Sequence, residues 1–240
     1  MKSSALIRVR ANTRLASSKP MSEPASDEQA VGEPVREDRF PYDRVVFFCD
    51  AVFAIVITLL AIELRLPGKE LIEQLGSDAA NSEFATLFIS YFISFIVTGL
   101  FWTGHMLSWK HVTRVNGRLV WLALLQLFFV VLMPFATREY SAAVSEQQPD
   151  RFVFYSLVLT GISLFSWLTR RQVVKQEGLY AKLGRAQTRW LLARGLIPFV
   201  VFACTIPLGF VLPAGVGVYV FGLILPFSFI AKRWIFAKGD

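Results

Sequence analysis

The chain has 240 residues, of which 54% are hydrophobic, and its formal net charge is +7 at pH 7. Soluble domains are usually about 45–50% apolar, so this composition excludes an ordinary soluble domain and indicates an integral membrane protein. The positive charge does not indicate a nucleic-acid-binding protein, because the sequence lacks a recognisable nucleic-acid-binding motif. Basic loops beside anionic lipid headgroups account for the charge instead.

The first 40 residues differ in composition from the rest. Residues 1–20 are basic and rich in serine, which is similar to an organellar transit peptide, whereas residues 22–43 are acidic. Neither part has a hydrophobic period, so we expect residues 1–40 to be a disordered extension. For residues 1–20 two interpretations stay open: a genuine transit-like segment, or a stretch upstream of a true translation start at Met21.

Six hydrophobic segments follow, each close to the roughly 20 residues that cross a bilayer. They lie at about residues 44–64, 84–108, 119–137, 152–169, 190–211 and 214–231. Their apolar runs are continuous rather than alternating, which predicts helices and not barrel strands. We therefore expect residues 41–235 to form one all-α integral membrane domain with six transmembrane helices.

Basic residues are concentrated between the second and third segments, between the fourth and fifth, and after the sixth. The connections on the other side are poorer in basic residues and more acidic, and the last of them carries no charge. Basic connections remain in the cytoplasm. This pattern predicts that both termini are cytoplasmic.

The first segment carries Arg44 and Asp50 near its start and is then uncharged for twelve residues. An ionisable residue close to hydrocarbon is a candidate functional residue. At 100° per residue, Ile55, Thr58 and Ile62 share one helix face, and Asp50 points about 140° away from Ile55. Ordinary helix packing or lipid contact also explains this apolar stripe.

The carboxylate of Asp50 needs a partner if it is buried. Trp102 and His105 lie three residues apart in the second segment and therefore share a helix face. The indole N–H is a donor, and the imidazole can donate or accept. We expect Asp50, Trp102 and His105 to form one hydrogen-bonded cluster.

The sequence gives little support for a metal site or an enzyme. His105 and His111 are the only histidines, and neither an HxxH nor a CxxC spacing occurs. A nucleophile elbow and a glycine-rich phosphate loop are also missing. Cys49 and Cys204 fall inside predicted segments, where we expect buried packing residues. We predict no catalytic residue, no metal and no cofactor.

Residues 44–50, with the sequence RVVFFCD, resemble the RxxxFSD signature of the transmembrane protein 175 family, the endolysosomal potassium channels and their prokaryotic relatives. Trp102-x-x-His105 and the sequence PFAT at residues 134–137 extend the resemblance, which covers about residues 40–235. Two positions depart from the family pattern. Cys49 replaces the signature serine, and Ala123 stands where the third helix commonly carries an asparagine.

The resemblance implies a passive, potassium-permeable cation channel, with weaker permeation of Na⁺. It implies a homotetramer in the membrane lipid, in which the first helix of each subunit lines a central pore. The family constriction matches Ile55, and Thr58 and Ile62 match the next pore-facing positions. Such an apolar constriction closes by dewetting. The residues implied as the signature and its supporting network are Arg44, Phe48, Cys49, Asp50, Trp102 and His105. The single-repeat form implies the plasma membrane of a bacterium.

Two other functions stay open. A proton-coupled secondary transporter would use Asp50 or Glu63 as a relay carboxylate, although the inverted repeats common in transporters are not evident. A non-conducting membrane adaptor is the third possibility. The channel hypothesis predicts that Ile55→Asn raises cation leak, and the adaptor hypothesis predicts no change.

Overall fold

The structure is a computed structural model that describes residues 40–64, 73, 76–146, 148–211, 222 and 224–237. The extension expected over residues 1–40 lies outside this part, except for Phe40. So does the first part of the segment expected at 214–231. Within the described residues the secondary structure is helical, apart from an isolated antiparallel bridge between Phe40 and Val115. The helices are α1 (Tyr42–Ile62), α3 (Ser77–Trp109), α4 (Gly117–Val131), α5 (Met133–Glu146), α6 (Pro149–Gln176), α7 (Leu179–Leu183), α8 (Arg185–Leu208) and α10 (Ile224–Ala237).

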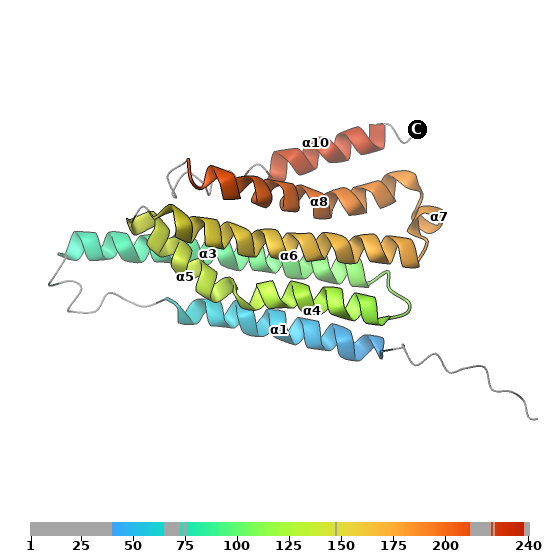
Figure 1. Ribbon diagram of the computed structural model, residues 1–240, viewed down its shortest axis with the longest axis horizontal. Helices are drawn as coiled ribbons and strands as arrows, with labels where there is room; N and C mark the ends of the chain where they lie inside the picture. The colour runs from blue at the N-terminus through green and yellow to red at the C-terminus, as the bar shows by residue number, and fades with distance from the viewer. Residues whose placement is uncertain are drawn as a thin grey trace, which may run out of the picture. The chain divides into compact units, whose positions relative to one another are not determined.

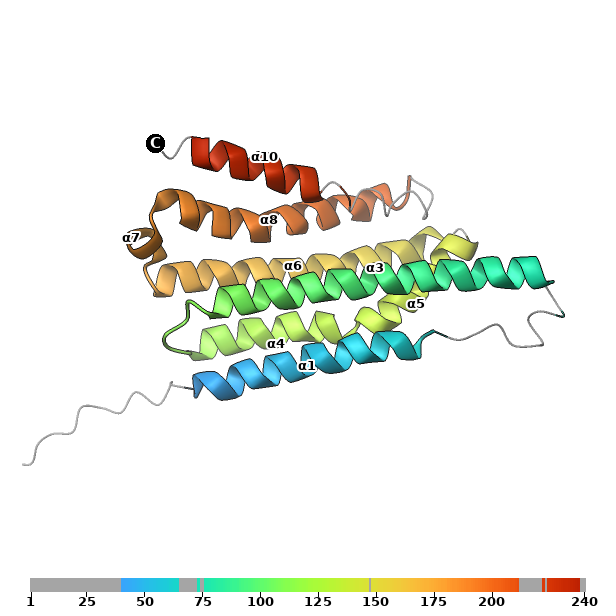
Figure 2. The ribbon, with the colours of Figure 1, turned by 180° about the vertical axis from the view of Figure 1, so that it is seen from behind.

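The long helices lie side by side (Figures 1 and 2). In both views α1 lies at one edge and α10 at the opposite edge, with α3 and α6 between them. Helix α6 packs against α8, α4, α5 and α3, whereas α1 packs against α3, α4 and α5, and α10 packs against α8. The α3–α4 and α6–α8 connections lie at the same end, which carries the basic connections (Figure 1).

Five helical stretches are long and apolar enough to cross a membrane: Tyr42–Ile62, Ser77–Trp109, Gly117–Val144, Pro149–Gln176 and Arg185–Leu208. They correspond to the first five predicted segments, but α3 and α6 extend beyond the predicted bounds of 84–108 and 152–169. Helix α10 occupies the second half of the sixth predicted segment.

Local sequence explains where several of these helices begin and end. The side chain of Asn116 caps α4 by accepting a hydrogen bond from the N–H of Leu119 at 2.9 Å. Pro134 lies in the first turn of α5, where its missing N–H is tolerated, and it separates α4 from α5. Gly178 and Gly184, with φ of 61° and 80°, flank the short helix α7 and permit the turn between α6 and α8.

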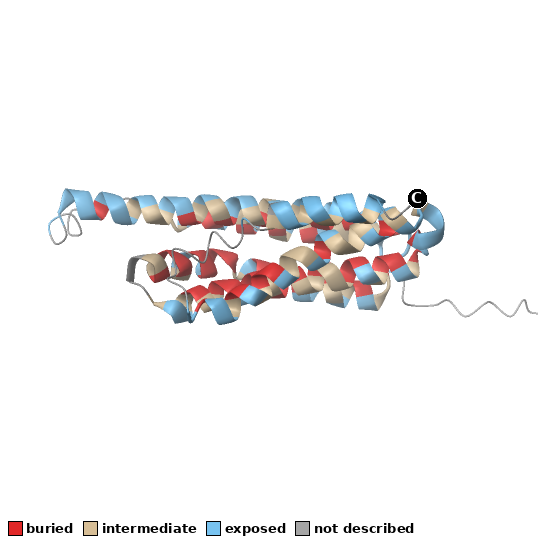
Figure 3. Ribbon diagram, turned by 90° about the horizontal axis from the view of Figure 1, so that it is seen from above, coloured by how far each residue is buried: buried red, intermediate tan, exposed pale blue. Residues whose placement is uncertain are grey.

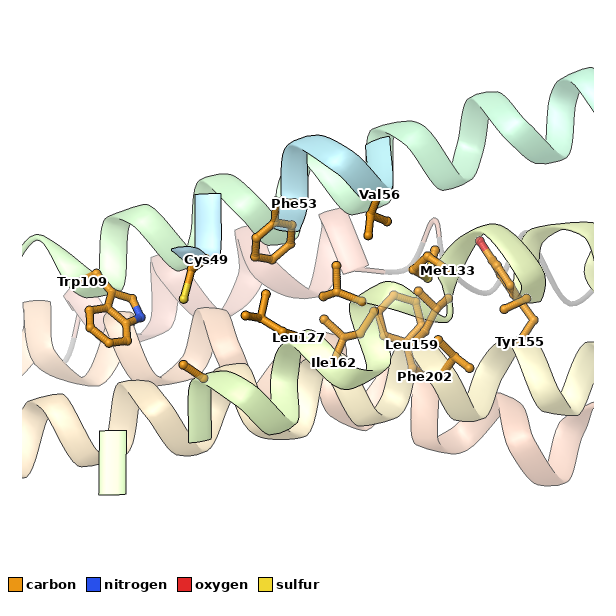
Figure 4. Close-up of a cluster of buried hydrophobic side chains, with 14 of the residues drawn as sticks. Cys49, Phe53, Val56, Trp109, Leu127, Met133, Tyr155, Leu159, Ile162 and Phe202 are labelled. Carbon is orange, nitrogen blue, oxygen red and sulfur yellow. The ribbon is translucent and has the colours of Figure 1, made fainter. Parts of the chain in front are cut away.

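The core lies between α1, α3, α4, α5, α6 and α8 (Figure 4). Its fully buried side chains include Phe53, Met133, Tyr155 and Leu159. Buried residues follow stripes along the helices, and the opposite faces are exposed (Figure 3).

One expectation about the two cysteines is wrong: the sequence predicts that both are buried, and Cys49 is buried, but Cys204 is exposed. Residues 195–208, the half of α8 that contains Cys204, are apolar on every side apart from Thr205, so the hydrophobic pattern there does not distinguish the face that packs from the face that is exposed.

Candidate ion-conduction site

Helix α1 has two different faces. Cys49, Phe53, Val56 and Leu60 are at most 1% exposed, and their spacing of four, three and four residues forms the face that packs on the bundle. The predicted pore residues lie elsewhere on the helix. Ile55 is 57% exposed, Ile62 is 65% exposed, and Thr58 is also exposed. The structure therefore places these three residues together on a face turned away from the chain's own core.

Thr58 is the polar member of this exposed face. Its hydroxyl donates a hydrogen bond to the carbonyl oxygen of Ile55 at 2.7 Å, one turn earlier in α1. A hydroxyl has one proton to donate and two lone pairs that can accept. Because the proton is used within the helix, the exposed Thr58 oxygen can act towards other groups only as an acceptor.

Asp50 is held on a different side of α1. The indole Nε1–H of Trp102 donates a hydrogen bond to Oδ1 of Asp50 at 2.9 Å, which joins α1 to α3. The predicted pairing of these two residues is present in the structure. A charge-assisted bond of this kind is stronger than a neutral one, and it fixes the carboxylate away from the exposed stripe.

His105 does not complete the expected three-residue cluster by a hydrogen bond to Asp50. Its Nδ1 lies 3.4 Å from Oε1 of Gln126 in α4, a long hydrogen bond. The imidazole packs between two aromatic rings, with its centroid 5.7 Å from that of Phe53 and 5.4 Å from that of Trp109. Phe53 and Trp109 are shown in Figure 4. His105 therefore joins α3 to α4, beside the link that Asp50 and Trp102 make between α1 and α3.

Gln126 was missed by the sequence interpretation. Gln126 is 1% exposed and is the single amide within the apolar run of α4. A lone amide among leucines and phenylalanines could have identified it from the sequence. Three atoms of this interior cluster are buried without a hydrogen-bond partner among the described residues: His105 Nε2, Trp109 Nε1 and Gln126 Nε2. Buried polar atoms of this kind commonly bind ordered water. The centre of the α1–α3–α4 packing is polar as well as aromatic.

The remaining signature residues divide between the interior and the surface. Cys49 is buried, whereas Phe48 is 52% exposed and Arg44 is also exposed. All three line a cavity of about 290 Å³ near the start of α1, together with Ala123 of α4. The two positions that depart from the family pattern, Cys49 and Ala123, therefore lie against the same empty space.

At the other end of α1, Glu63 is paired rather than free. Its Oε2 lies 4.0 Å from Nη1 of Arg138 in α5, and Arg138 also lies 3.7 Å from Glu139. The side chain of Arg138 is 54% exposed, so these ion pairs are weak. They place Glu63 in a surface network outside the apolar stretch of α1.

The model of the family described as endosomal/lysosomal potassium channel TMEM175 matches residues 44–134, which run from the signature to α5. A potassium channel from Chryseobacterium sp. is 30% identical over 143 residues, covering 60% of this chain and 70% of that protein. A potassium channel from Streptomyces collinus is 32% identical over 127 residues, covering 50% of this chain and 59% of that protein.

More distant matches extend the comparison. The endosomal/lysosomal proton channel TMEM175 of Bos taurus is 30% identical over 179 residues, but the chain spans only 37% of that protein. Among solved structures, the crystal structure of a lysosomal potassium-selective channel TMEM175 homolog from Chamaesiphon minutus has a TM-score of 0.65 at 21% identity. The match covers 80% of this chain and 98% of that one, and it shows the same fold. The chain therefore belongs to the TMEM175 family, a family of membrane ion channels and not of enzymes.

Proposed function

We propose that the chain is a potassium-permeable cation channel that conducts passively through a hydrophobic constriction formed by α1 of four subunits. The observation that carries the proposal is the exposed face of α1, where Ile55 and Ile62 are 57% and 65% exposed while the opposite face is fully packed. The apolar windows of α1, α3 and α8 are each only 22% buried within one chain, against 56% for α6, and among these three helices only α1 carries the signature residues and the Ile55–Thr58–Ile62 stripe. Helix α1 is therefore available to pack against other copies of itself.

A closed cyclic assembly would bring four copies of this face around one axis. At 1.5 Å per residue, the Ile55 and Ile62 rings would be about 10 Å apart along the pore, with the Thr58 ring between them. A narrow apolar ring excludes water and blocks ions until it widens. The acceptor oxygens of the Thr58 ring would then replace part of the water lost by an entering ion. Potassium sheds this water more readily than sodium.

In this proposal Asp50 is part of the scaffold and not a relay for protons. The hydrogen bond from Trp102 holds its carboxylate against α3. Over residues 51–62 the exposed face that contains Ile55, Thr58 and Ile62 carries alanine, isoleucine, leucine and threonine side chains but no titratable residue. The exposed Arg44 lies about three turns before Ile55, at the start of α1. These observations support passive conduction over the coupled transport that Asp50 or Glu63 would serve.

The proposal includes the topology and location expected from the sequence. We propose that residues 41–235 form a six-helix membrane domain with both termini in the cytoplasm; the extension expected over residues 1–40 lies outside the described residues, except for Phe40. The position of the α3–α4 and α6–α8 connections at one end supports this topology, because both connections are basic (Figure 1). We place the homotetramer in a bacterial plasma membrane, in line with the two bacterial relatives.

Cation flux in liposomes tests the proposed function. The purified full-length chain is reconstituted, and K⁺ efflux is followed first with a K⁺ gradient alone and then with an added pH gradient. A channel produces flux that follows the K⁺ gradient and exceeds the flux of Na⁺ under the same gradient. Flux that appears only with a pH gradient would contradict the proposal and assign coupled transport instead.

A further inference from the structure

A second cavity lies apart from α1, between α3, α6, α8 and α10, and has a volume of about 460 Å³. One part of its wall is cationic and is formed by Arg170, Arg194 and Lys232. Another part is apolar and is formed by Val97, Leu100, Phe101, Pro198, Phe202 and Ile224. The combination of these two surfaces in one cavity has no role in the proposed pore.

Arg170 is the fixed part of the cationic wall. The residue is only 7% exposed, although it lies in α6 within a membrane-spanning stretch. Its Nε–H donates to Oγ of Ser108 at 2.9 Å, and its Nη2–H donates to the carbonyl oxygen of Gly104 at 3.1 Å. A guanidinium has five N–H donors, so these bonds orient the group and leave donors for a ligand. Arg170 is therefore a preorganised anion-binding group.

The described residues that line this cavity supply positive charge without a counter-charge. Arg194 lies close enough to Arg170 for their charges to repel each other. The polar lining residues near them are serines, Ser163, Ser166 and Ser228, and the described wall contains no aspartate or glutamate. Arg170 is the buried member of this cluster, and a charge removed from water without a counter-charge is costly. A ligand that supplies negative charge would stabilise this cluster, and serine hydroxyls are suitable donors to its oxygen atoms.

The axial positions of the two surfaces identify the kind of ligand. Given a rise of 1.5 Å per residue, Arg170, Arg194 and Lys232 lie within about 14 Å of the basic ends of their helices. Val97 of α3, Pro198 of α8 and Ile224 of α10 lie about 18–20 Å from the same ends of their helices, whereas Leu100 and Phe101 lie about 12–14 Å deep, level with Arg194. The cavity is thus cationic near the membrane surface and apolar deeper in the bilayer. The C-terminal ends of α6 and α10 lie at the same end of the bundle in Figure 2.

We propose that this cavity binds one anionic phospholipid. Its phosphate is held by Arg170, Arg194 and Lys232, and an acyl chain lies along the apolar wall of α3, α8 and α10. Basic pockets between transmembrane helices are suited to anionic lipid headgroups. A free phosphate ion would use the cationic wall only and would leave the deeper apolar surface uncovered. The proposal concerns a lipid site and does not depend on which ion the channel conducts.

Lipid binding by the purified full-length chain in detergent tests the proposal, with native mass spectrometry to count bound lipids. Phosphatidylglycerol and phosphatidylcholine are titrated separately. We expect wild type to bind one phosphatidylglycerol at least tenfold more tightly than phosphatidylcholine, and Arg194→Gln/Lys232→Gln to lose this preference. The two substituted side chains are exposed, and Arg170 keeps its bonds to α3.

The matched control is Arg185→Gln/Arg189→Gln, which removes two exposed charges at the start of α8 outside the cavity wall. We expect this control to keep the preference. Equal loss in both double variants would show diffuse surface attraction and overturn the proposal. Displacement of phosphatidylglycerol by inorganic phosphate at equal concentration would also overturn it, because the site would then be one for a soluble anion.

A third variant tests the cavity without altering charge. Ser228→Trp places a large ring in the wall that α10 contributes, and we expect it to weaken phosphatidylglycerol binding at least fivefold. Unchanged binding in a folded Ser228→Trp protein would place the lipid elsewhere and contradict the proposal.

Discussion

The indole nitrogen of Trp102 donates a hydrogen bond to the carboxylate of Asp50 at 2.9 Å, and this bond joins α1 to α3. A second bond between the same helices runs from the hydroxyl of Tyr42 to the carbonyl oxygen of Trp109 at 3.2 Å. Packing and these bonds fix the other side of α1 against the bundle. The stripe that contains Ile55 and Ile62 consequently faces outward. The same region of α3 carries His105, which contacts α4 through Gln126, and Gly104, which contacts Arg170 of α6. Residues 102–105 thus connect the proposed pore helix to the rest of the bundle.

Replacing Trp102 with phenylalanine keeps an aromatic ring and removes the hydrogen bond. We expect a loss of about 1–3 kcal/mol in stability, because a half-buried carboxylate is left without its donor. Thermal unfolding in detergent, followed by size-exclusion chromatography, measures the change. The matched control is Trp121→Phe, at a side chain that is 67% exposed. Equal effects of the two substitutions would show that the bond contributes nothing.

Ala123→Asn restores the residue type that the family commonly has in this helix. Ala123 is 2% exposed, but it lines the cavity of about 290 Å³ beside Cys49, so an amide has space there. We expect a small change in stability, within about 1 kcal/mol, since close-packed sites lose about 1–3 kcal/mol on enlargement. The control is Ala136→Asn, at a fully buried alanine outside that cavity. Thermal unfolding of both variants compares their stabilities. A larger loss of stability in Ala123→Asn than in Ala136→Asn would contradict the prediction.

Gly161 of α6 packs directly against the ring of Phe129 in α4. A Cβ atom at this position would lie 2.5–2.6 Å from ring atoms of Phe129, whose ring stacks on Phe165. We expect Gly161→Ala to destabilise the protein by about 1–3 kcal/mol, because the stacked ring has to move. Gly99→Ala is the matched control, since a Cβ there meets nothing within 4 Å. That substitution should be neutral or stabilising by up to about 1 kcal/mol; a destabilising effect equal to that at Gly161 would refute the steric explanation.

Glu177 makes a pH-dependent contact outside the membrane-spanning stretches. Burial raises the pKa of its carboxyl, but hydrogen bonds from the N–H and hydroxyl of Thr113 and the charge of Lys182 outweigh burial and lower that pKa overall. The Thr113 bonds are 3.0 and 2.8 Å long. A lowered folded-state pKa means that the stabilisation is present above the unfolded-state pKa of about 4.3 and is lost as the pH falls through the folded-state value.

We therefore expect the melting temperature of the wild type to decrease when the pH is lowered below about 4.3. In Glu177→Gln, the melting temperature should depend less on pH in this range. Thermal unfolding between pH 7 and pH 3 measures it. Glu83→Gln, at an exposed side chain in α3, is the control and should retain the wild-type profile. Identical profiles for wild type and Glu177→Gln would exclude this carboxyl as a source of the acid sensitivity.

Sequence predicted the features that depend on single helices. The lengths of the apolar runs located five membrane-spanning stretches, and a period of 100° per residue put Ile55, Thr58 and Ile62 on one face of α1. The contact between Asp50 and Trp102 was also predictable, because a carboxylate near hydrocarbon requires a donor.

Apart from the Asp50–Trp102 contact, features that depend on which helices are neighbours could not be predicted. Gln126 is the partner of His105 only because α4 packs beside α3, and one sequence contains no information on that pairing. Arg170 was counted with the basic connection after the fourth segment, but it lies inside α6 and is buried against Ser108. A long arginine side chain with five N–H donors can find hydrogen-bond acceptors on neighbouring helices inside a bundle. The position of a charged residue alone therefore does not mark the end of a membrane helix.

The central claim is that the exposed stripe of α1 is the constriction of a cation pathway. Potassium and sodium flux in liposomes containing Ile55→Asn tests it most directly, with Ile89→Asn as the control, since both isoleucines are 57% exposed and only Ile55 lies on α1. We predict that Ile55→Asn raises cation leak and weakens the preference for K⁺, because a polar ring no longer dewets, while Ile89→Asn behaves as wild type. Flux and selectivity that stay unchanged in Ile55→Asn would contradict the account.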